Sequence, residues 1–314
     1  MKNIFVSTLF SLLLAMCSSA PVASSCDRAE FIDHVLVDVP VEEGTALMPG
    51  THFTKTWQVL NAGTCAWGEG YALVHTGGHA LSGAPEIALP AVAAGETVDL
   101  SLRLTAPSLL GTYTSEWMLR NAAGALFGVG PQGDRPLTAA LVVPELPAGV
   151  VYDFAQVMCL ARWDSDRASF LPCEGLNDEQ GMLDGYVSLA PNGTIEVKPN
   201  NQTNGLIAGY FPPVTVQAGD HFRATVGCVD ENPNCEIVFM LKYRVDEGGQ
   251  TSADEIIFTN PFPLSAEQIT DIDMDLSALQ GNVVTFILFM QENGGRSLDA
   301  IGYWLNPRIE NMAP

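Results

Sequence analysis

The sequence is poor in charged side chains, and above all in basic ones. Charged residues make up 16% of the 314 residues, with 14 Lys and Arg against 36 Asp and Glu, so the formal net charge is −22. A protein with this surplus of negative charge repels the phosphates of nucleic acids and the headgroups of anionic membranes. We therefore expect no nucleic-acid partner, and membrane association only through an N-terminal lipid anchor.

Segments that favour long helices are scarce as well. The chain contains 29 Gly and 20 Pro, and 47% of its residues are hydrophobic. This balance is typical of short strands separated by turns. A length of 314 residues is enough for two domains of ordinary size. We therefore expect an all-β protein built from two domains.

The motifs of common catalytic sites are also missing. The sequence contains no Gly-x-Ser-x-Gly elbow, no P-loop, no dinucleotide fingerprint and no Cys-x-x-Cys metal-ligand pair. His75 and His79 are separated by Thr-Gly-Gly, whose two glycines mark a loop, and no further metal ligand follows at a useful spacing. We predict a protein that is not an enzyme and that carries no cofactor other than a structural ion.

The N-terminus, residues 1–25, has the features of a secretory signal and a tether. Lys2 precedes an apolar run over 4–16 that is too short to span a bilayer. Residues 14–17, Leu-Ala-Met-Cys, approximate the lipobox of bacterial lipoproteins and predict lipidation of Cys17, although Met16 is larger than the residue usual at its position. The alternative is ordinary cleavage between residues 20 and 25. In both cases we expect a bacterial protein that is exported to the cell surface or the extracellular space.

The six remaining cysteines support export. Their positions in the strand pattern favour three local disulfides, and such bridges form in oxidising compartments. The predicted pairs are Cys26 with Cys65, Cys159 with Cys173, and Cys228 with Cys235.

Residues 53–67, Phe-Thr-Lys-Thr-Trp-Gln-Val-Leu-Asn-Ala-Gly-Thr-Cys-Ala-Trp, combine an alternating strand, a turn and two tryptophans. A second alternating strand over 97–105, Gly-Thr-Tyr-Thr-Ser-Glu-Trp at 111–117 and Gly-Ala-Leu-Phe-Gly at 124–128 follow. With these features the region 31–143 resembles the four-tryptophan (FW) domain, the Ig-like domain of a eukaryotic autophagy cargo receptor that also occurs in bacterial surface proteins. The resemblance implies an Ig-like β-sandwich over 26–145.

By this resemblance Trp57, Trp67 and Trp117 are three of the family's four tryptophans. No tryptophan occurs over 129–137, where the fourth is expected. In the autophagy receptor the domain recognises proteins, which implies a protein ligand. The alternative for all three side chains is packing inside the sandwich, and we favour it.

A short linker, predicted over 146–150, precedes a second strand-rich region over 151–314. Near its end stand Asp-Leu-Ser at 275–277, Leu-Gln-Gly at 279–281 and Asp-Ala-Ile-Gly-Tyr-Trp at 299–304. These segments resemble the closing strands of carbohydrate-binding jelly rolls. The resemblance implies a jelly-roll-like β-sandwich as the second domain.

Aromatic side chains of this second region are candidate sugar contacts, because their faces stack on the C–H groups of sugars. We predict ligand contacts at Trp163, Tyr210, Tyr243 and Tyr303. Trp163 is expected to be the most exposed, because it lies between two charged residues in the proposed disulfide loop 159–173. Packing in the core is the alternative for such aromatics.

Asp271 and Asp273 alternate along one predicted strand, so their carboxylates share a face with that of Asp275. Neighbouring carboxylates can raise one another's pKa and supply a general acid, or they can bind calcium through their oxygens. A solvated strand face is the ordinary interpretation. We rank the solvated face first, a structural calcium ion at Asp271 and Asp273 second, and catalysis last.

These observations favour an exported, non-catalytic binding protein that recognises a surface protein or a glycan through the faces and loops of its sandwiches. The alternative is a structural spacer or an envelope-assembly lipoprotein without a small ligand. A glycoside hydrolase that uses carboxylates of the second domain comes third.

Overall fold

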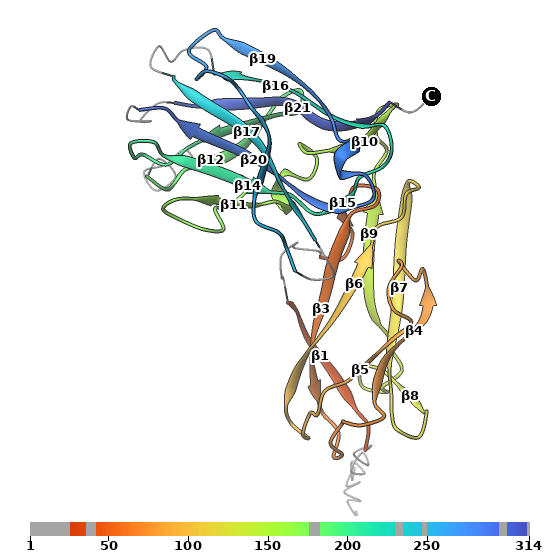
Figure 1. The fold of residues 1–314 in the computed structure, drawn as a ribbon. Helices are drawn as coiled ribbons and strands as arrows, with labels where there is room; N and C mark the ends of the chain where they lie inside the picture. The colour runs from red at the N-terminus through yellow and green to blue at the C-terminus, as the bar shows by residue number, and fades with distance from the viewer. Residues whose placement is uncertain are drawn as a thin grey trace, which may run out of the picture.

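The computed structural model describes residues 26–35, 42–175, 183–229, 235–246, 250–294 and 300–312. These residues form two β-sandwiches, of which the C-terminal one lies across one end of the N-terminal one (Figure 1). Short 3-10 helices such as η1 (Met158–Leu160) and η2 (Ser277–Leu279) lie between strands. The prediction of an all-β fold is confirmed. Among the described residues, no helix has the length and hydropathy needed to span a membrane. The predicted signal segment and Cys17 lie outside the described residues.

The N-terminal sandwich has the sheet division of an Ig-like domain. One sheet is antiparallel and has the order β1-β3-β6; the other has the order β2-β9-β7-β4-β5, with β8 paired to β7 and β2 parallel to β9. The strands are β1 (Ala29–Val35), β2 (Thr45–Ala46), β3 (His52–Asn61), β4 (Ala72–Gly78), β5 (Glu86–Ala88), β6 (Thr97–Thr105), β7 (Gly111–Arg120), β8 (Leu126–Phe127) and β9 (Leu137–Val143).

Strand β6 shows how the sequence pattern specifies this sandwich. Leu100, Leu102 and Leu104 are buried, whereas Asp99 and Arg103 between them are exposed. Alternate side chains of a strand point to opposite faces, so one face of β6 packs on the core and the other meets water. The predicted half-buried antiparallel strand over 97–105 is confirmed.

Lys55 interrupts this pattern on the neighbouring strand β3. It shares the inner face with Phe53 and Trp57, and only 2% of its side chain is exposed. Its ammonium group lies against a carboxylate, with Nζ 3.8 Å from Glu43 Oε1. Burial lowers the pKa of Lys55, and the negative charge of Glu43 opposes this effect.

The C-terminal sandwich consists of two antiparallel sheets with jelly-roll-like connectivity, in which the chain crosses repeatedly between the layers. One sheet has the order β12-β13-β21-β16-β19, with β10 paired to β21, and the other has the order β11-β14-β20-β17-β18, with β15 paired to β20. The strands are β10 (Val150–Asp153), β11 (Arg162–Ser165), β12 (Tyr186–Ala190), β13 (Thr194–Lys198), β14 (Leu206–Tyr210), β15 (Val214–Thr215), β16 (Asp220–Cys228), β17 (Ile237–Val245), β18 (Glu255–Thr259), β19 (Ile269–Asp275), β20 (Val283–Glu292) and β21 (Gly302–Asn311).

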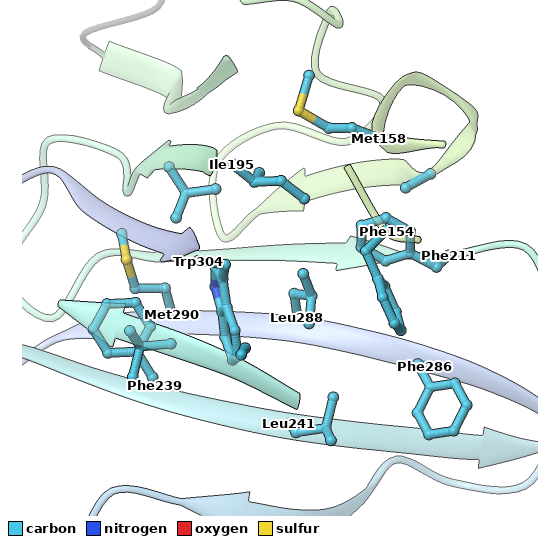
Figure 2. Packing of buried hydrophobic residues seen from close by; sticks show 14 of the residues in the cluster. Phe154, Met158, Ile195, Phe211, Phe239, Leu241, Phe286, Leu288, Met290 and Trp304 are labelled. Atoms are coloured by element: carbon cyan, nitrogen blue, oxygen red, sulfur yellow. The ribbon is translucent and has the colours of Figure 1, made fainter. Parts of the chain in front are cut away.

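Aromatic rings fill the space between these two sheets (Figure 2). Trp304 of β21 is fully buried and packs edge-on against Phe239, with ring centroids 5.4 Å apart, and against Phe222 at 6.3 Å. Phe154 contacts Phe211 in the same edge-on manner at 4.8 Å. Such aromatic pairs add to the free energy gained from burying their apolar surface, so this cluster is the centre of the second core.

All three predicted disulfides are confirmed. Their Cα atoms lie 4.9, 5.2 and 6.3 Å apart, within the range that a disulfide requires. They join Cys26 to Cys65, Cys159 to Cys173, and Cys228 to Cys235. Each closes a local loop, and the three together fit a protein that folds in an oxidising compartment.

The segment 48–52 of the N-terminal sandwich makes the junction with the second sandwich. Met48 is fully buried and belongs to the core cluster of the C-terminal sandwich, where its Sδ lies 3.5 Å from the backbone nitrogen of Asp153. The backbone N–H of His52 donates a hydrogen bond to the carbonyl oxygen of Pro213 at 2.8 Å. One sandwich therefore contributes a side chain to the core of the other.

Candidate functional site

The three tryptophans assigned by the family resemblance lie inside the N-terminal sandwich. Trp57 and Trp117 are fully buried, and Trp67 is 2% exposed. The indole N–H of Trp57 donates to the carbonyl oxygen of Thr138 at 2.8 Å, and that of Trp117 donates to Ser115 Oγ at 2.8 Å. These contacts support the interpretation as core packing rather than as ligand contact.

Trp163 is also buried, so the prediction that it is the exposed aromatic of the second domain is wrong. Its side chain is 1% exposed, points into the core between the sheets, and donates its indole N–H to the carbonyl oxygen of Met158 at 3.0 Å. The flanking Arg162 and Asp164 point outward, and alternation along strand β11 therefore turns Trp163 inward.

The 159–173 loop does carry an exposed aromatic ring, but it is that of Phe170. This side chain is 73% exposed. Its backbone N–H donates to Asp164 Oδ1 at 3.0 Å, which ties the loop to strand β11. The guanidinium carbon of Arg162 lies 5.6 Å from the centroid of the Phe170 ring. The sequence signal for this site is therefore the loop with its disulfide rather than its tryptophan.

Tyr210 lies beside this loop, on the outer face of the sheet β11-β14-β20-β17-β18. Arg162 is its direct neighbour across β11 and β14, and the guanidinium carbon lies 4.6 Å from the centroid of the Tyr210 ring. Arg244 approaches from β17 to 4.7 Å. Contacts of this length between a cation and a ring are attractive. Phe170, Arg162, Tyr210 and Arg244 thus form a chain in which rings and guanidinium groups alternate.

A second cation–ring pair lies on the same outer face. Nζ of Lys242 is 3.3 Å from the centroid of the Phe289 ring. Ala208 and Ile287 are buried beneath these side chains and, with Phe289, form a small apolar cluster separate from the main core. We call the surface made by Phe170, Arg162, Tyr210, Arg244, Lys242 and Phe289 the Tyr210 face.

Carboxylates hold the two arginines of the Tyr210 face in place. Nε of Arg162 lies 3.0 Å from Asp164 Oδ2, and Nε of Arg244 pairs with Asp254 Oδ1. The hydrogen bond to Asp254 raises the pKa of Arg244, so its guanidinium is charged at any relevant pH. Burial raises the pKa of Tyr210, which stays a neutral phenol.

Tyr243 and Tyr303 do not join this surface, so the four aromatics predicted as ligand contacts do not form one site. Tyr243 packs partly against the core, and its hydroxyl donates to Glu255 Oε2 at 2.5 Å. Tyr303 lies on the outer face of the opposite sheet, over Gly227, where an added Cβ would come within 2.6 Å of the tyrosine hydroxyl. Of the four predicted contacts, only Tyr210 lies on the candidate surface.

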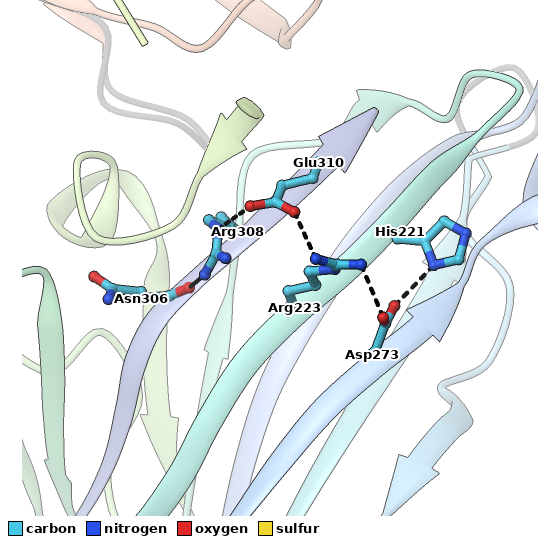
Figure 3. A network of polar contacts seen from close by, with 6 residues as sticks. All are labelled: His221, Arg223, Asp273, Asn306, Arg308 and Glu310. Atoms are coloured by element: carbon cyan, nitrogen blue, oxygen red, sulfur yellow. Dashed lines mark hydrogen bonds and ion pairs between the residues drawn. The ribbon is translucent and has the colours of Figure 1, made fainter. Parts of the chain in front are cut away.

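Asp271 and Asp273 share the exposed face of β19, as the alternation predicts, but both have protein partners. His221 and Arg223 bind the two oxygens of Asp273 at 2.8 and 2.9 Å (Figure 3). The hydroxyl of Thr225 donates to Asp271 at 2.6 Å. The hydrogen bond from His221 lowers the pKa of Asp273.

This arrangement disfavours the predicted calcium ion at Asp271 and Asp273, because the guanidinium group of Arg223 already neutralises the charge that would attract a cation. Elsewhere in the part of the chain that the structure describes, no group of three or more His, Cys, Asp or Glu side chains is placed to hold a metal.

A cleft of about 840 Å³ opens beside the junction and is lined by both sandwiches. His52 bridges it, with Nδ1 3.2 Å from Thr105 Oγ1 and Nε2 2.9 Å from Thr215 Oγ1. Burial lowers the pKa of His52, which favours the neutral ring. Asp220 accepts a hydrogen bond from Asn311 Nδ2 at 2.8 Å. Since these polar groups bond to one another, the Tyr210 face is the stronger candidate site.

Comparisons with known proteins bear on the N-terminal sandwich. Residues 40–133 match the Ig-like domain from next to BRCA1 gene. This match confirms the predicted resemblance of the region to an FW-type Ig-like domain. Bacterial origin and export stay predictions.

Two relatives cover the same part of the chain. Protein JOKA2 of Solanum tuberosum is 36% identical over 105 residues, which are 32% of this chain and 12% of that protein. Protein ILRUN of Danio rerio is 32% identical over 91 residues, 29% of this chain and 32% of that protein. The chain thus spans less than a third of either relative, and the similarity concerns the Ig-like region.

Among solved structures, the xylan-binding domain from CBM 22 aligns with 53% of this chain and 97% of that domain, at 12% identity and a TM-score of 0.33. A likeness at this TM-score supports no conclusion about fold or ligand. The jelly-roll-like architecture is therefore assigned from the strand pairing of this chain itself.

Proposed function

We propose that this chain is an exported, non-catalytic binding protein whose C-terminal sandwich recognises a polysaccharide through the Tyr210 face. The observation that carries the proposal is the alternation of rings and cations on one outward sheet face, from the exposed Phe170 through Arg162 and Tyr210 to Arg244. Sugar recognition needs flat apolar surface beside polar groups that bind hydroxyls, and this face offers both.

The carboxylates of the face have a supporting role in this proposal. Asp254 accepts a hydrogen bond from Nε of Arg244, and Asp164 forms an ion pair with Arg162, so both carboxylates orient the guanidinium groups. Asp164 also accepts the backbone N–H of Phe170 and positions the exposed ring. A role in positioning accounts for both side chains and requires no chemical step.

Alanine substitutions on the Tyr210 face test the proposal. We expect the full chain to bind at least one polysaccharide on an array, and Phe170→Ala and Tyr210→Ala each to weaken that binding by roughly 2- to 10-fold. The first variant removes an exposed ring contact, and the second removes the ring that supports Arg162 and Arg244. Tyr303→Ala is the matched control, because it removes a tyrosine from the outer face of the opposite sheet. The proposal fails if no polysaccharide binds, or if Tyr303→Ala weakens binding and the other two variants do not.

A second candidate function, a spacer that holds its two ends in a fixed orientation, is favoured by the junction. Met48 inserts into the opposite core, and the backbone hydrogen bond from His52 to Pro213 reinforces the contact. A side chain shared between two cores couples their positions.

Small-angle scattering tests the spacer function. We expect the intact chain to fit one arrangement of the sandwiches and Met48→Ala, which leaves a cavity at the junction, to broaden the distance distribution. A substitution of similar size in the second core away from the junction, Met290→Ala, should leave the distribution unchanged. Scattering from the intact chain that already requires several orientations would contradict a spacer role.

A further inference from the structure

The Tyr210 face concentrates positive charge on a strongly acidic protein. The chain has 14 basic residues and a net charge of −22, yet the cations Arg162, Lys242 and Arg244 lie together on this one sheet face. Their acidic neighbours are Asp164 and Asp254. Among the described residues, the local balance of three cations and two carboxylates is positive, so this face attracts an anion more than the acidic remainder of the surface does.

The two arginines keep their outer nitrogens available. In the described residues, Asp164 and Asp254 pair with the Nε atoms, and the terminal Nη groups of Arg162 and Arg244 have no hydrogen-bond partner. Arg223 on the opposite sheet shows the contrasting case, because its two Nη atoms bind Asp273 and Glu310 at 2.9 and 3.1 Å (Figure 3). An open guanidinium edge matches the two oxygens of a carboxylate.

The Tyr210 ring supports the guanidinium groups. The guanidinium carbons of both arginines lie within 4.7 Å of the centroid of this ring. Arg162 approaches from β11 on one side of β14, and Arg244 approaches from β17 on the other side. A ring engaged by two cations has little free face for a neutral sugar, but it fixes the direction in which the cations point. The arginines, rather than the tyrosine, are therefore the groups that a ligand meets first.

We propose that the ligand of the Tyr210 face is an acidic polysaccharide whose uronate carboxylates bind the Nη groups of Arg162 and Arg244. Lys242 provides a third positive charge, and the exposed ring of Phe170 packs on a sugar ring at the end of the site. This inference rests on the proposed function and specifies the class of glycan.

The position of the site on the sheet favours a glycan over an acidic peptide. Arg162 lies on the edge strand β11, but Tyr210, Phe289, Lys242 and Arg244 lie on β14, β20 and β17, and each of these three strands is hydrogen-bonded to a strand on both sides. Peptides that bind sheets commonly add a strand to an open edge and pair with its backbone. A ligand over the centre of this sheet meets side chains alone, which suits a polymer that carries its charges on sugar rings.

Titration of the full chain with polygalacturonate, and with the same polymer after methyl esterification, tests the inference. Esterification removes the negative charges and keeps the sugar backbone. We expect Arg162→Gln and Arg244→Gln each to weaken binding of polygalacturonate by about 10- to 100-fold, the loss typical of a hydrogen bond between charged groups. Binding should also weaken steeply as the salt concentration rises.

Three controls separate the outcomes. Arg223→Gln removes an arginine whose two Nη nitrogens are already occupied and should leave binding unchanged. Thermal unfolding confirms that each variant is folded. Lys242→Gln gives an independent readout if an arginine variant fails to fold. Poly-L-glutamate and neutral xylan complete the set of probes, and both should bind weakly.

If xylan or the esterified polymer binds as tightly as polygalacturonate does, the inference of an acidic ligand is overturned. The proposed recognition of a polysaccharide would then still hold. Tighter binding of poly-L-glutamate than of polygalacturonate would overturn the inference of an acidic polysaccharide in favour of an acidic peptide. Binding of none of the polymers would overturn the inference and the proposed function together.

Discussion

Replacement of Lys198 with methionine is expected to lower the free energy of unfolding by about 3–5 kcal/mol at pH 8, the cost of leaving a buried carboxylate without a compensating charge. Lys198, at the end of β13, is fully buried, and Glu292, at the end of β20, is 3% exposed. Burial raises the pKa of Glu292, and the backbone of Asn204 and the charge of Lys198 oppose this rise. Without Lys198, the carboxylate stays buried and loses a compensating charge.

The expected loss depends on pH with a definite sign. A carboxyl group whose pKa is raised in the folded state binds more protons folded than unfolded, so the free energy of unfolding falls as the pH rises from the unfolded value of 4.5 through the folded pKa. Lys198→Met raises that folded pKa further and extends the window upward. At pH 4, where Glu292 is largely protonated in both states, most of the cost of the substitution should disappear.

Urea unfolding of the chain and its variants at pH 4 and pH 8 measures both effects. The control is the double variant Lys198→Met with Glu292→Gln, which removes both charges and should recover most of the stability at pH 8. An equal loss at the two pH values would show that packing of the lysine chain, and not its charge, is responsible.

Replacement of Trp304 with alanine should lower the free energy of unfolding by about 3–5 kcal/mol at any pH, the usual cost of removing a large aromatic side chain from a core. Trp304 is fully buried between the two sheets of the C-terminal sandwich, against the ring of Phe239 (Figure 2) and that of Phe222. The packed sheets cannot move together far enough to fill the cavity, because both are held by continuous strand pairing.

Calorimetry of Trp304→Ala and Trp304→Phe measures this effect. The phenylalanine variant keeps most of the apolar volume and a ring, so it should lose clearly less stability than the alanine variant. The transition of the N-terminal sandwich should stay where it is, because Trp304 belongs to the other core cluster. A loss below about 1 kcal/mol for Trp304→Ala would show that the cluster repacks around the cavity.

The Tyr210 face was partly predictable from the sequence. Tyr210 was predicted as a ligand contact, and the 159–173 loop was predicted to present an aromatic ring. The choice of Trp163 was wrong because strand alternation places it inside, between two outward charges. Phe170 carried no sequence signal of its own, since a loop residue has no periodicity that would indicate its exposure.

The sequence by itself determined the all-β class, the strand over 97–105, the three disulfides and the FW-type resemblance of the N-terminal region, because alternation, turn residues and cysteine spacing are local properties. Tertiary structure alone decided which charges meet. Arg162, Tyr210 and Arg244 come from three strands, and Lys198 and Glu292 from opposite sheets. Met48 enters the core of the other sandwich. Each of these contacts depends on sheet order and packing between layers, which period-two patterns along a single strand do not specify.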